Sequence, residues 1–479
     1  MAARHLTRAL LLCLGLAVAA LGTASPANAG TRDEVSIIDD QLLLNATPAA
    51  LDADMAKFKA LGVDRLRVSA FWNQIAPANL SRQKPTGFDG RNPGDGRYSW
   101  GPLDRVVDSA SRHGLRIMVS ISTPAPIWAT GVTKVPNPLW KPNPAEFADF
   151  AQAVVTRYAD RVDHWGISNE PNQGVWLQPQ SDKSGLVAPH LYRALVQAAY
   201  PRIKAIDPTS TALVGELAAS GRSGRGATRP IRPLLFLRAM ACRDAKWKPI
   251  RTGRCKGFKP IPIDALGHHP YNLLQRPTNA SPNRYDAAIA DGARLTRTLD
   301  RLTRLKALAP GRGRRLSIFY TEFGYQTSPP DPFAGVTLSQ QRLYLQQAAY
   351  VAYKTPRVRG LNQFRLTDGA IAGTGLKRFA EFQSGLLFRN RKPKPAYSVF
   401  AHPFVITGNR FWGQVRPGTG HTVRVQRRDS ERGPWRLVAQ VITSRLGYFS
   451  FNLPGRKPGT YRYVYDRPSG TSGQVVVRR

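Results

Sequence analysis

The stretch HWGISNEPN, residues 164–172, decides the fold because an apolar run ends there in an amide, a carboxylate and a proline. Residues 162–168 have the length and partial alternation of a buried strand. Pro171 cannot donate a ladder hydrogen bond, so we expect Asn169 and Glu170 at the strand's C-terminal end. In a (β/α)8 barrel, active sites are built at such ends. By itself the Asn-Glu-Pro triplet is equally compatible with an ordinary turn.

A second carboxylate follows another apolar run, LSIFYTEFGYQ at residues 316–326. Residues 316–320 have the pattern of a buried strand, and Glu322 comes directly after it. Two carboxylates flanking one sugar bond are what glycoside hydrolysis requires, one as general acid and the other as nucleophile or as base. The alternative is a pair of unrelated loop glutamates.

The two motifs, in this order and at this separation, resemble clan A of the glycoside hydrolases. That clan has (β/α)8 barrels with the acid/base glutamate after strand four and the nucleophile after strand seven. The resemblance implies that Glu170 is the acid/base, that Glu322 is the nucleophile and that Asn169 holds the sugar's 2-hydroxyl. SGLL at 384–387 and KPAY at 394–397 resemble the last part of family 5 or family 39 barrels, so the resemblance extends from about residue 35 to 404.

Two further predicted strands carry residues that fit this resemblance. Arg67 lies among apolar neighbours in the strand predicted over 63–72, and a buried arginine needs an anionic partner. The resemblance implies that Arg67 bonds the nucleophile; the alternative is an arginine on the outside of the barrel. HPY at 269–271 matches the clan's His-x-Tyr element, which implies that Tyr271 contacts the nucleophile and His269 faces the sugar. Because adjacent strand residues point to opposite faces, we expect His268 to pack elsewhere and no zinc site from the pair.

Aromatic residues at predicted strand ends are candidate platforms for sugar rings. Trp72 and Trp128 lie at such ends, although a core position suits Trp72 almost as well. Glu216, near the end of the strand predicted over 212–217, is either a sugar contact or an ordinary loop residue. The chain departs from the clan pattern at Gln363-Phe364, where many members have Trp-Phe. A polar floor there would weaken stacking at the cleaved sugar.

Counting repeats along the chain supports a barrel followed by a smaller domain. Strands are predicted over 35–39, 63–72, 115–122, 162–168, 212–217, 263–271, 316–320 and 359–366, and helices over 47–61, 103–113, 144–158, 192–206 and 338–353. Residues 408–479 contain six short alternating segments cut by turns, which is typical of a β-sandwich. We therefore predict a barrel domain over 30–405 and a sandwich over 406–479, whose Trp412, Trp435, Tyr448 and Tyr463 form either a sugar-binding face or a core.

The N-terminal segment predicts export. Arg4 and Arg8 precede an apolar run over 9–21, and residues 27–29, Ala-Asn-Ala, form a cleavage site, so residues 1–29 have the pattern of a signal peptide. We expect a secreted mature chain without a transmembrane segment. Cys242 and Cys255 are then expected to form a disulfide, because no histidine or third cysteine lies close enough to complete a metal site.

The charge is strongly positive, with 69 Lys and Arg against 31 Asp and Glu and a formal net charge of +38. Such a chain is expected to adhere to polyanions, including anionic cell-envelope polymers, with an affinity that falls with salt. The basic residues form no tract interleaved with aromatic residues and no recognisable nucleic-acid motif, so we expect no specific nucleic-acid partner. The charge therefore indicates envelope retention or a composition bias rather than substrate choice.

The sequence thus predicts a retaining glycosidase of a β-linked oligo- or polysaccharide that works by double displacement. No cofactor is implied, because carboxylates and water suffice. We expect the two carboxyl groups to lie roughly 5–5.5 Å apart, with the pKa of Glu170 raised and Glu322 kept ionised beside Arg67. The alternative is a non-catalytic secreted barrel that binds cell-wall or anionic glycans. Arg67, Glu170, Tyr271 and Glu322 argue for catalysis, whereas Gln363 argues mildly for the alternative.

Overall fold

The computed structural model describes residues 34–466, apart from 312 and 314, and residues 469–478. The predicted signal peptide, with Arg4, Arg8 and the cleavage site, lies outside the described residues.

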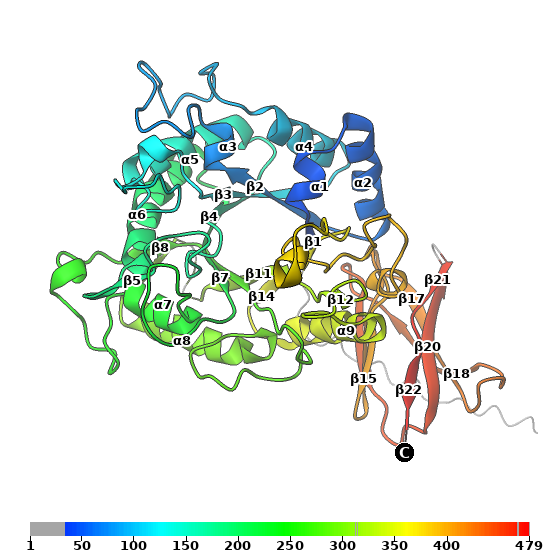
Figure 1. The fold of residues 1–479 in the computed structure, drawn as a ribbon. Coiled ribbons are helices and arrows are strands. Elements are labelled where there is room, and N and C mark those ends of the chain that lie inside the picture. Colours follow the sequence, from blue (N-terminus) through cyan, green and yellow to red (C-terminus); the bar gives the residue numbers. More distant parts are fainter. Residues whose placement is uncertain (1–33, 312, 314, 467–468, 479) are drawn as a thin grey trace, which may run out of the picture.

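The first domain is a closed barrel of eight parallel strands, as predicted. Going round the barrel, the strands follow the order β1-β14-β11-β9-β7-β4-β3-β2, which Figure 1 shows as a ring. Their bounds are β1 (Glu34–Ile38), β2 (Arg65–Phe71), β3 (Arg116–Ser122), β4 (His164–Ile167), β7 (Thr211–Ala218), β9 (Ala265–His269), β11 (Ser317–Phe323) and β14 (Val358–Phe364). The strand predicted over 263–271 divides, because β8 (Ile261–Ile263) leaves the barrel to pair with β10 (Leu308–Pro310).

Helices surround the ring of strands (Figure 1). The longer ones are α2 (Pro48–Ala60), α4 (Gly101–Arg112), α5 (Pro144–Tyr158), α6 (Ala188–Ile206), α7 (Pro233–Met240), α8 (Gly292–Arg304) and α9 (Leu338–Lys354). Thr47 caps α2 by accepting from the Ala50 amide, and Asn143 caps α5 in the same way. The helices pack their apolar sides on the barrel and leave the strand ends open to loops.

Short elements occupy those loops. They are α1 (Asp40–Leu44), α3 (Trp72–Ile75), α10 (Tyr397–Phe400), β5 (Ser181–Asp182), β6 (Gly185–Leu186), β12 (Thr327–Ser328), β13 (Val336–Thr337) and the 3-10 turns η1 (Ile127–Ala129), η2 (Gly253–Cys255), η3 (Ile289–Asp291) and η4 (Gly375–Phe379). The connections after the strands are long, which is where a barrel carries its functional residues.

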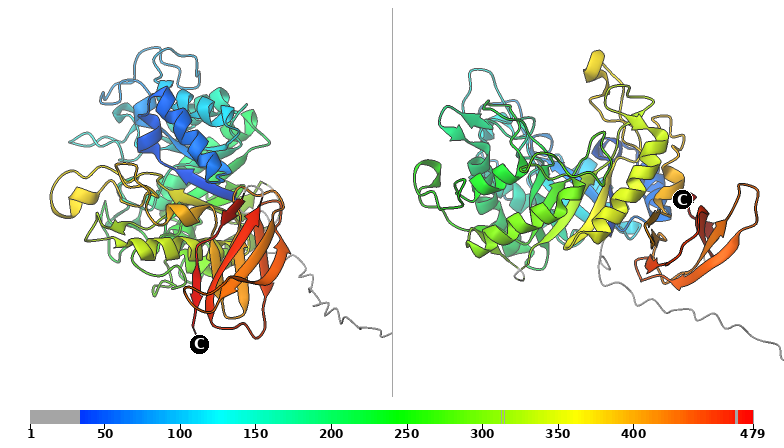
Figure 2. Two further views of the ribbon diagram at one scale, coloured as in Figure 1. Left: turned by 90° about the vertical axis from the view of Figure 1, so that its right-hand side faces the viewer. Right: turned by 90° about the horizontal axis from the view of Figure 1, so that it is seen from below.

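The C-terminal domain consists of two antiparallel sheets that lie beside the barrel (Figure 2). One sheet contains β15 (Phe404–Thr407), β16 (Arg410–Gln414) and β19 (Tyr448–Asn452), and the other β17 (Thr422–Arg428), β18 (Arg436–Ile442), β20 (Gly459–Asp466), β21 (Ser469–Thr471) and β22 (Val475–Val477). Strands β15 and β21 were not among the six short segments predicted for this domain. Strand β15, the first of these two sheets, begins at Phe404 and pairs with β16.

The aromatic residues of this domain do not form a sugar-binding face. Tyr463 is fully buried between the sheets, and Trp412 and Tyr448 are buried against Tyr353 of α9. Trp435 lies between the guanidinium groups of two arginines. Three of the four candidate residues thus hold the domain together or attach it to the barrel.

The predicted disulfide is present. Cys242 and Cys255 are bonded, with Cα atoms 5.7 Å apart, and close a loop that follows α7 on the connection from β7 to β9. Among the described residues, no helix is both long and apolar enough to cross a membrane.

Candidate active site

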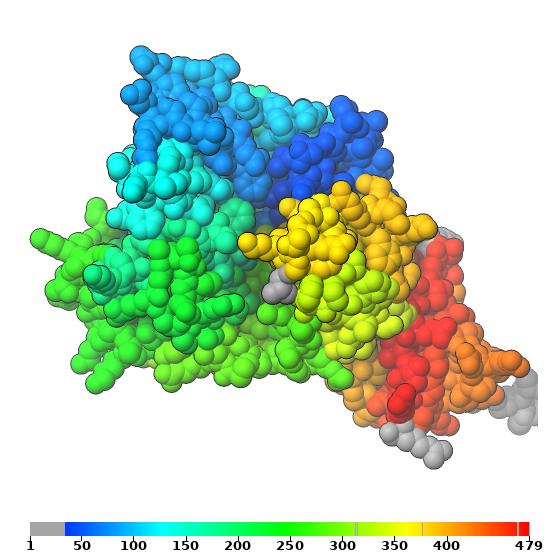
Figure 3. Space-filling view, in the orientation of Figure 1, coloured from blue at the N-terminus to red at the C-terminus, as the bar shows by residue number. Residues whose placement is uncertain are grey.

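The two predicted catalytic carboxylates meet at one end of the barrel. Glu170 follows the C-terminal end of β4, and Glu322 is the second-last residue of β11. One oxygen of each lies within 4.8 Å of the other and of a ring nitrogen of His269. The space-filling view shows this face of the molecule hollowed near the centre of the ring (Figure 3). The carboxylates therefore lie at the barrel's mouth, as their positions in the sequence suggested.

Arg67 of β2 connects both motifs from inside the barrel. Its guanidinium donates from Nη1 to Glu322 Oε1 at 2.9 Å and from Nη2 to Asn169 Oδ1 at 2.8 Å. Arg67 is fully buried, so it does not lie on the outside of the barrel. The bond to Asn169 leaves the amide NH2 of that residue as the group that donates outward.

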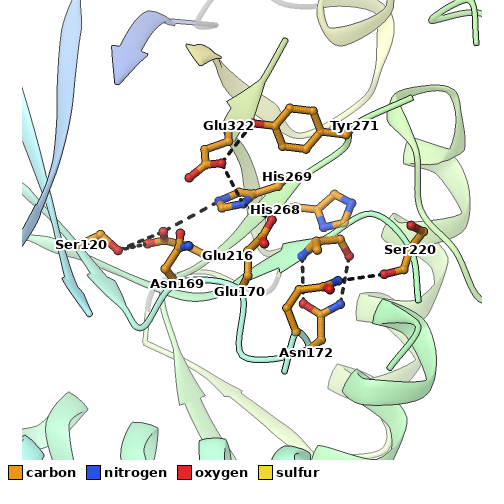
Figure 4. A network of polar contacts seen from close by, with 12 residues as sticks. Ser120, Asn169, Glu170, Asn172, Glu216, Ser220, His268, His269, Tyr271 and Glu322 are labelled. Atoms are coloured by element: carbon orange, nitrogen blue, oxygen red, sulfur yellow. Dashed lines mark hydrogen bonds and ion pairs between the residues drawn. The ribbon is translucent and has the colours of Figure 1, made fainter. Parts of the chain in front are cut away.

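The last residue of β9, His269, and Tyr271 just after it approach the same two carboxylates (Figure 4). The Tyr271 hydroxyl donates to Glu322 Oε2 at 3.1 Å, and His269 Nδ1 is hydrogen-bonded to Glu170 Oε1 at 2.9 Å. His268 points the other way and bonds the Ala287 carbonyl at 2.6 Å. The opposite directions of the two histidines follow from strand alternation.

Burial shifts the pKa values of these groups. It raises the pKa of Glu170 to about 7, against the attraction of Arg67. Burial also raises the pKa of Glu322, opposed by His269, Arg67 and the hydrogen bond from Tyr271. Burial lowers the pKa of His269 to about 4, so the ring is neutral at pH 7. Burial thus outweighs these opposing groups in setting the pKa of Glu322.

A third carboxylate, that of Glu216, shares Arg67 with Glu322. Glu216 of β7, left open by the sequence, is fully buried inside the barrel and forms an ion pair with Arg67. Both of its oxygens accept from the Ser120 hydroxyl, at 3.1 and 3.0 Å. Glu216 is thus neither a loop residue nor an exposed sugar contact. It takes a share of the charge that Arg67 offers to Glu322.

The backbone is shaped to hold Glu216. The register between β7 and β9 shifts between Gly215 and Leu217, and Glu216 itself has a φ of +44°. Such a φ is unfavourable for a non-glycine residue and commonly occurs at functional sites. A Cβ added at Gly166 would lie 1.8 Å from Glu216 Oε1, and one at Gly267 would lie 2.7 Å from Cγ. Only glycine leaves room for this side chain in β4 and β9.

The structure distinguishes the two tryptophan candidates. Trp72 is 1% exposed and packs on Phe147, Phe150 and Trp128, so it belongs to the core and not to the cleft. Trp128 is half-buried, with its ring edge against Trp72 and its indole N–H bonded to the Pro77 carbonyl. Strand β2 ends at Phe71 and α3 begins at Trp72, which turns the tryptophan inward.

Gln363 is not a polar floor. Its amide donates to the carbonyls of Phe364 and Ser384, both at 2.9 Å, and the side chain is buried. The aromatic ring at the end of β14 is that of Phe364, which lies 6.3 Å from the Tyr271 ring and 5.4 Å from the Phe382 ring. An aromatic surface therefore borders the site although the usual tryptophan is absent.

The structure also contains a stacked aromatic pair that was not among the sequence-based predictions. The half-buried rings of Phe71, at the end of β2, and Trp176, after β4, lie 6.3 Å apart and nearly parallel. Both positions belong to the barrel end that carries the carboxylates. The sequence does show two adjacent aromatic residues, Phe71 and Trp72, where this strand is predicted to end. Which of the two rings is buried in the core depends on the orientation of the strand, and the sequence does not reveal that orientation.

The carboxylate oxygens of Glu170 and Glu322 and a ring nitrogen of His269 also lie close enough together to bind a cation. The hydrogen bonds of His269 and Tyr271 to the two carboxylates account for this closeness within the protein itself.

Comparison of the sequence with protein-family models and with curated proteins finds no match. Comparison of the structure finds glycoside hydrolases. A family 39 glycoside hydrolase from Bacteroides cellulosilyticus WH2 aligns with a TM-score of 0.54 and 16% identity over 94% of this chain and 82% of that one. A glucosidase from Croceicoccus marinus gives 0.51 and 13% over 90% and 94%. A GH5_18 protein from Streptomyces cattleya, in complex with Manb1-4GlcNAc, gives 0.50 and 16% over 76% and 78%. The likeness shows that the chain shares the barrel fold of these glycoside hydrolases.

Proposed function

We propose that this chain is a secreted retaining glycoside hydrolase acting on a β-linked glycan. The observation that carries the proposal is the pair Glu170 and Glu322, with oxygens within 4.8 Å of each other at the mouth of the barrel. Retaining enzymes hold their two carboxyl groups roughly 5–5.5 Å apart, whereas inverting enzymes need a wider gap for a water molecule. The closer spacing supports retention.

The neighbours of the two carboxylates give them different roles. Glu322 receives direct hydrogen bonds from Arg67 and Tyr271, which stabilise its anion for attack on the anomeric carbon. Glu170 has a pKa of about 7, so near neutral pH it can donate a proton to the departing oxygen and later take one from water. The double displacement follows. A covalent glycosyl–Glu322 ester forms first, and a water molecule that Glu170 deprotonates then hydrolyses this ester.

Other groups at the barrel mouth would position the sugar. Asn169, oriented by Arg67, has its amide NH2 available for the 2-hydroxyl. The rings of Phe364, Phe71 and Trp176 offer apolar surface for sugar faces.

The proposal includes export and attachment. Residues 1–29 have the pattern of a signal peptide, and the Cys242–Cys255 disulfide suits an oxidising compartment. The formal net charge of +38 would favour adhesion to anionic envelope polymers outside the cell.

The test is hydrolysis of a panel of aryl β-glycosides by the wild-type protein and by Glu322→Ala. We expect activity in the wild type, its loss in the variant and rescue by azide as an α-glycosyl azide, the product of attack on the vacated face. Glu322→Gln serves as the matched control, because it keeps the side-chain volume and should not be rescued. Failure of every substrate in the panel, with binding of the same glycans intact, would favour the non-catalytic barrel.

A further inference from the structure

A depression of about 950 Å³ lies on the outer wall of the barrel, away from the carboxylates. It runs along α8, which covers the barrel between β9 and β11 (Figures 1 and 2). Arg315 and Arg357, which precede β11 and β14, mark its lower end, opposite the catalytic end of the strands. We call this depression the α8 groove.

The α8 groove is lined almost wholly by one kind of charge. Within the described part of the chain, its lining contains eight arginines and a single carboxylate, that of Asp300. Asp300 pairs with Arg357 at 2.6 Å, and Arg294 pairs with Asp291 at 3.1 Å. Among the described residues that line it, none is a lysine. Arginine differs from lysine in offering a planar fork that binds two oxygens of a carboxylate, sulfate or phosphate at once.

Three of these arginines form a stripe on the exposed side of α8. Arg297, Arg301 and Arg304 are exposed and follow the spacing i, i+4, i+7, which places them on one helix face. Leu295, Leu299 and Leu302 on the other face are buried in the core. Charges this close repel one another within the screening length of roughly 8 Å at physiological salt. An anion lying along the stripe would relieve that repulsion.

Aromatic rings hold some of the guanidinium groups in place. Arg301 lies 4.5 Å above the ring of Trp247, which belongs to the loop closed by the disulfide. Arg284 and Arg238 lie 4.8 and 5.6 Å from the ring of Tyr285. Their donors are thereby pre-ordered, which lowers the entropy cost of binding. Both rings also pack against the apolar core, and guanidinium groups lie over them, so neither ring projects as a free platform for a nucleobase.

We propose that the α8 groove binds an acidic polysaccharide through its carboxylate or sulfate groups. The volume exceeds that of a single anion, and the stripe from Arg297 to Arg304 extends over about two turns of α8, which suits a linear polymer with repeated charges. The choice of a polysaccharide over nucleic acid rests partly on the proposed function, under which the barrel mouth acts on a glycan. Binding along the outer wall would keep the protein on an acidic polymer without occupying the catalytic site.

The test uses a fluorescein-labelled polygalacturonate oligomer and measures anisotropy at roughly 50 and 200 mM salt. The groove variant is Arg297→Gln/Arg304→Gln/Arg315→Gln, three exposed side chains of the lining. The control variant, Arg389→Gln/Arg432→Gln/Arg445→Gln, removes the same charge from exposed positions outside the lining. We expect the groove variant to lose about tenfold or more in affinity at low salt with a flatter salt dependence, and the control variant less than about threefold.

Three results would overturn the proposal. Equal losses in the two variants would show diffuse attraction to the whole surface. Tighter, groove-dependent binding of duplex DNA would assign the groove to nucleic acid. Absence of polygalacturonate binding by the wild type at low salt would leave the groove without its ligand.

Circular dichroism and thermal melting check that both variants fold. Since none of the six arginines contacts the carboxylates, unchanged aryl glycoside hydrolysis separates failure of the groove from failure of the glycosidase.

Discussion

Glu170 and Glu322 both lie at the barrel mouth, yet their hydrogen-bond partners differ. Glu322 accepts hydrogen bonds from the charged Arg67 and from Tyr271, whereas Glu170 is hydrogen-bonded to the ring of His269, which is neutral at pH 7. A charged donor stabilises a carboxylate anion more than a neutral ring does, and Glu170 lacks such a donor. This difference at the level of single side chains supports the roles proposed for them, Glu170 as the acid and Glu322 as the nucleophile.

The pKa of Glu170 sets the first prediction. Burial raises this pKa to about 7, and under the proposed function the protonated form is the general acid, so kcat/KM should fall as the pH rises through about 7. Glu170→Gln cannot titrate, so this alkaline limb should disappear for substrates whose leaving group needs no protonation. The measurement is a pH profile of kcat/KM for both proteins. An alkaline limb that persists in Glu170→Gln would assign it to another group.

Glu216 sets the second prediction, since it competes with Glu322 for Arg67. Glu216→Gln keeps the volume and removes the charge, so more of the Arg67 charge acts on Glu322 and lowers its pKa. We expect the acidic limb of the pH profile to move to lower pH by about one unit. Ser120→Ala, which removes the hydroxyl donor to Glu216 but leaves every charge, is the control. A limb that moves equally in both variants would contradict the role given to Glu216.

At the scale of elements, β4, β7 and β9 cooperate to place one side chain. The irregular register of β7 turns Glu216 into the barrel, and glycines at 166 and 267 of the neighbouring strands leave space for it. The carboxylate cannot easily yield, because Arg67 and Ser120 both bind it. The packing of side chains inside the barrel is therefore as constrained as the arrangement of residues at its mouth.

Gly166→Ala should consequently disturb the barrel. The new Cβ would lie 1.8 Å from Glu216 Oε1, so the carboxylate must move away from its partners. We expect the free energy of unfolding to fall by about 1–3 kcal/mol, as for other overpacked cores, measured by denaturant titration. Gly96→Ala is the control, because nothing lies within 4 Å of its added Cβ. Equal stability of the two variants would show that Glu216 relaxes freely.

At the scale of the whole molecule, the C-terminal domain is fixed to the barrel by aromatic side chains. Trp412 of β16 is fully buried and lies 5.4 and 5.6 Å from the rings of Tyr350 and Tyr353 on α9. Arg416 reaches across as well, donating to the Phe400 carbonyl at 2.6 Å. The two domains share apolar surface, so we expect them to unfold together.

Trp412→Ala should therefore lower the free energy of unfolding by about 3–5 kcal/mol, the usual loss for a large buried aromatic residue. Trp435→Ala is the control, since Trp435 is only half-buried and lies between arginine side chains. Calorimetry of both variants measures the effect. A second, separate transition in Trp412→Ala alone would show that this side chain couples the domains, whereas equal shifts in both would contradict its position at the interface.

The sequence by itself determined the barrel, the sandwich and the disulfide. Apolar runs that end in Asn169-Glu170 or Glu322 mark strands with polar tips, and parallel strands bring such tips to one end of the barrel. The fit of Arg67 and Tyr271 to a known pattern placed them beside Glu322, where the structure has them. These features depend on local pattern and on the regular geometry of the fold.

Only the tertiary structure decided which way individual side chains face. Trp72 faces the core and Phe71 does not, because β2 gives way to α3 between them. Glu216 enters the barrel through a register shift that no periodicity reveals, and Gln363 turns onto backbone carbonyls. The α8 groove combines arginines from segments far apart in the chain. Such features arise from long-range packing. There, the direction in which one side chain points, or the absence of a Cβ on a neighbouring glycine, outweighs the local preference of the sequence.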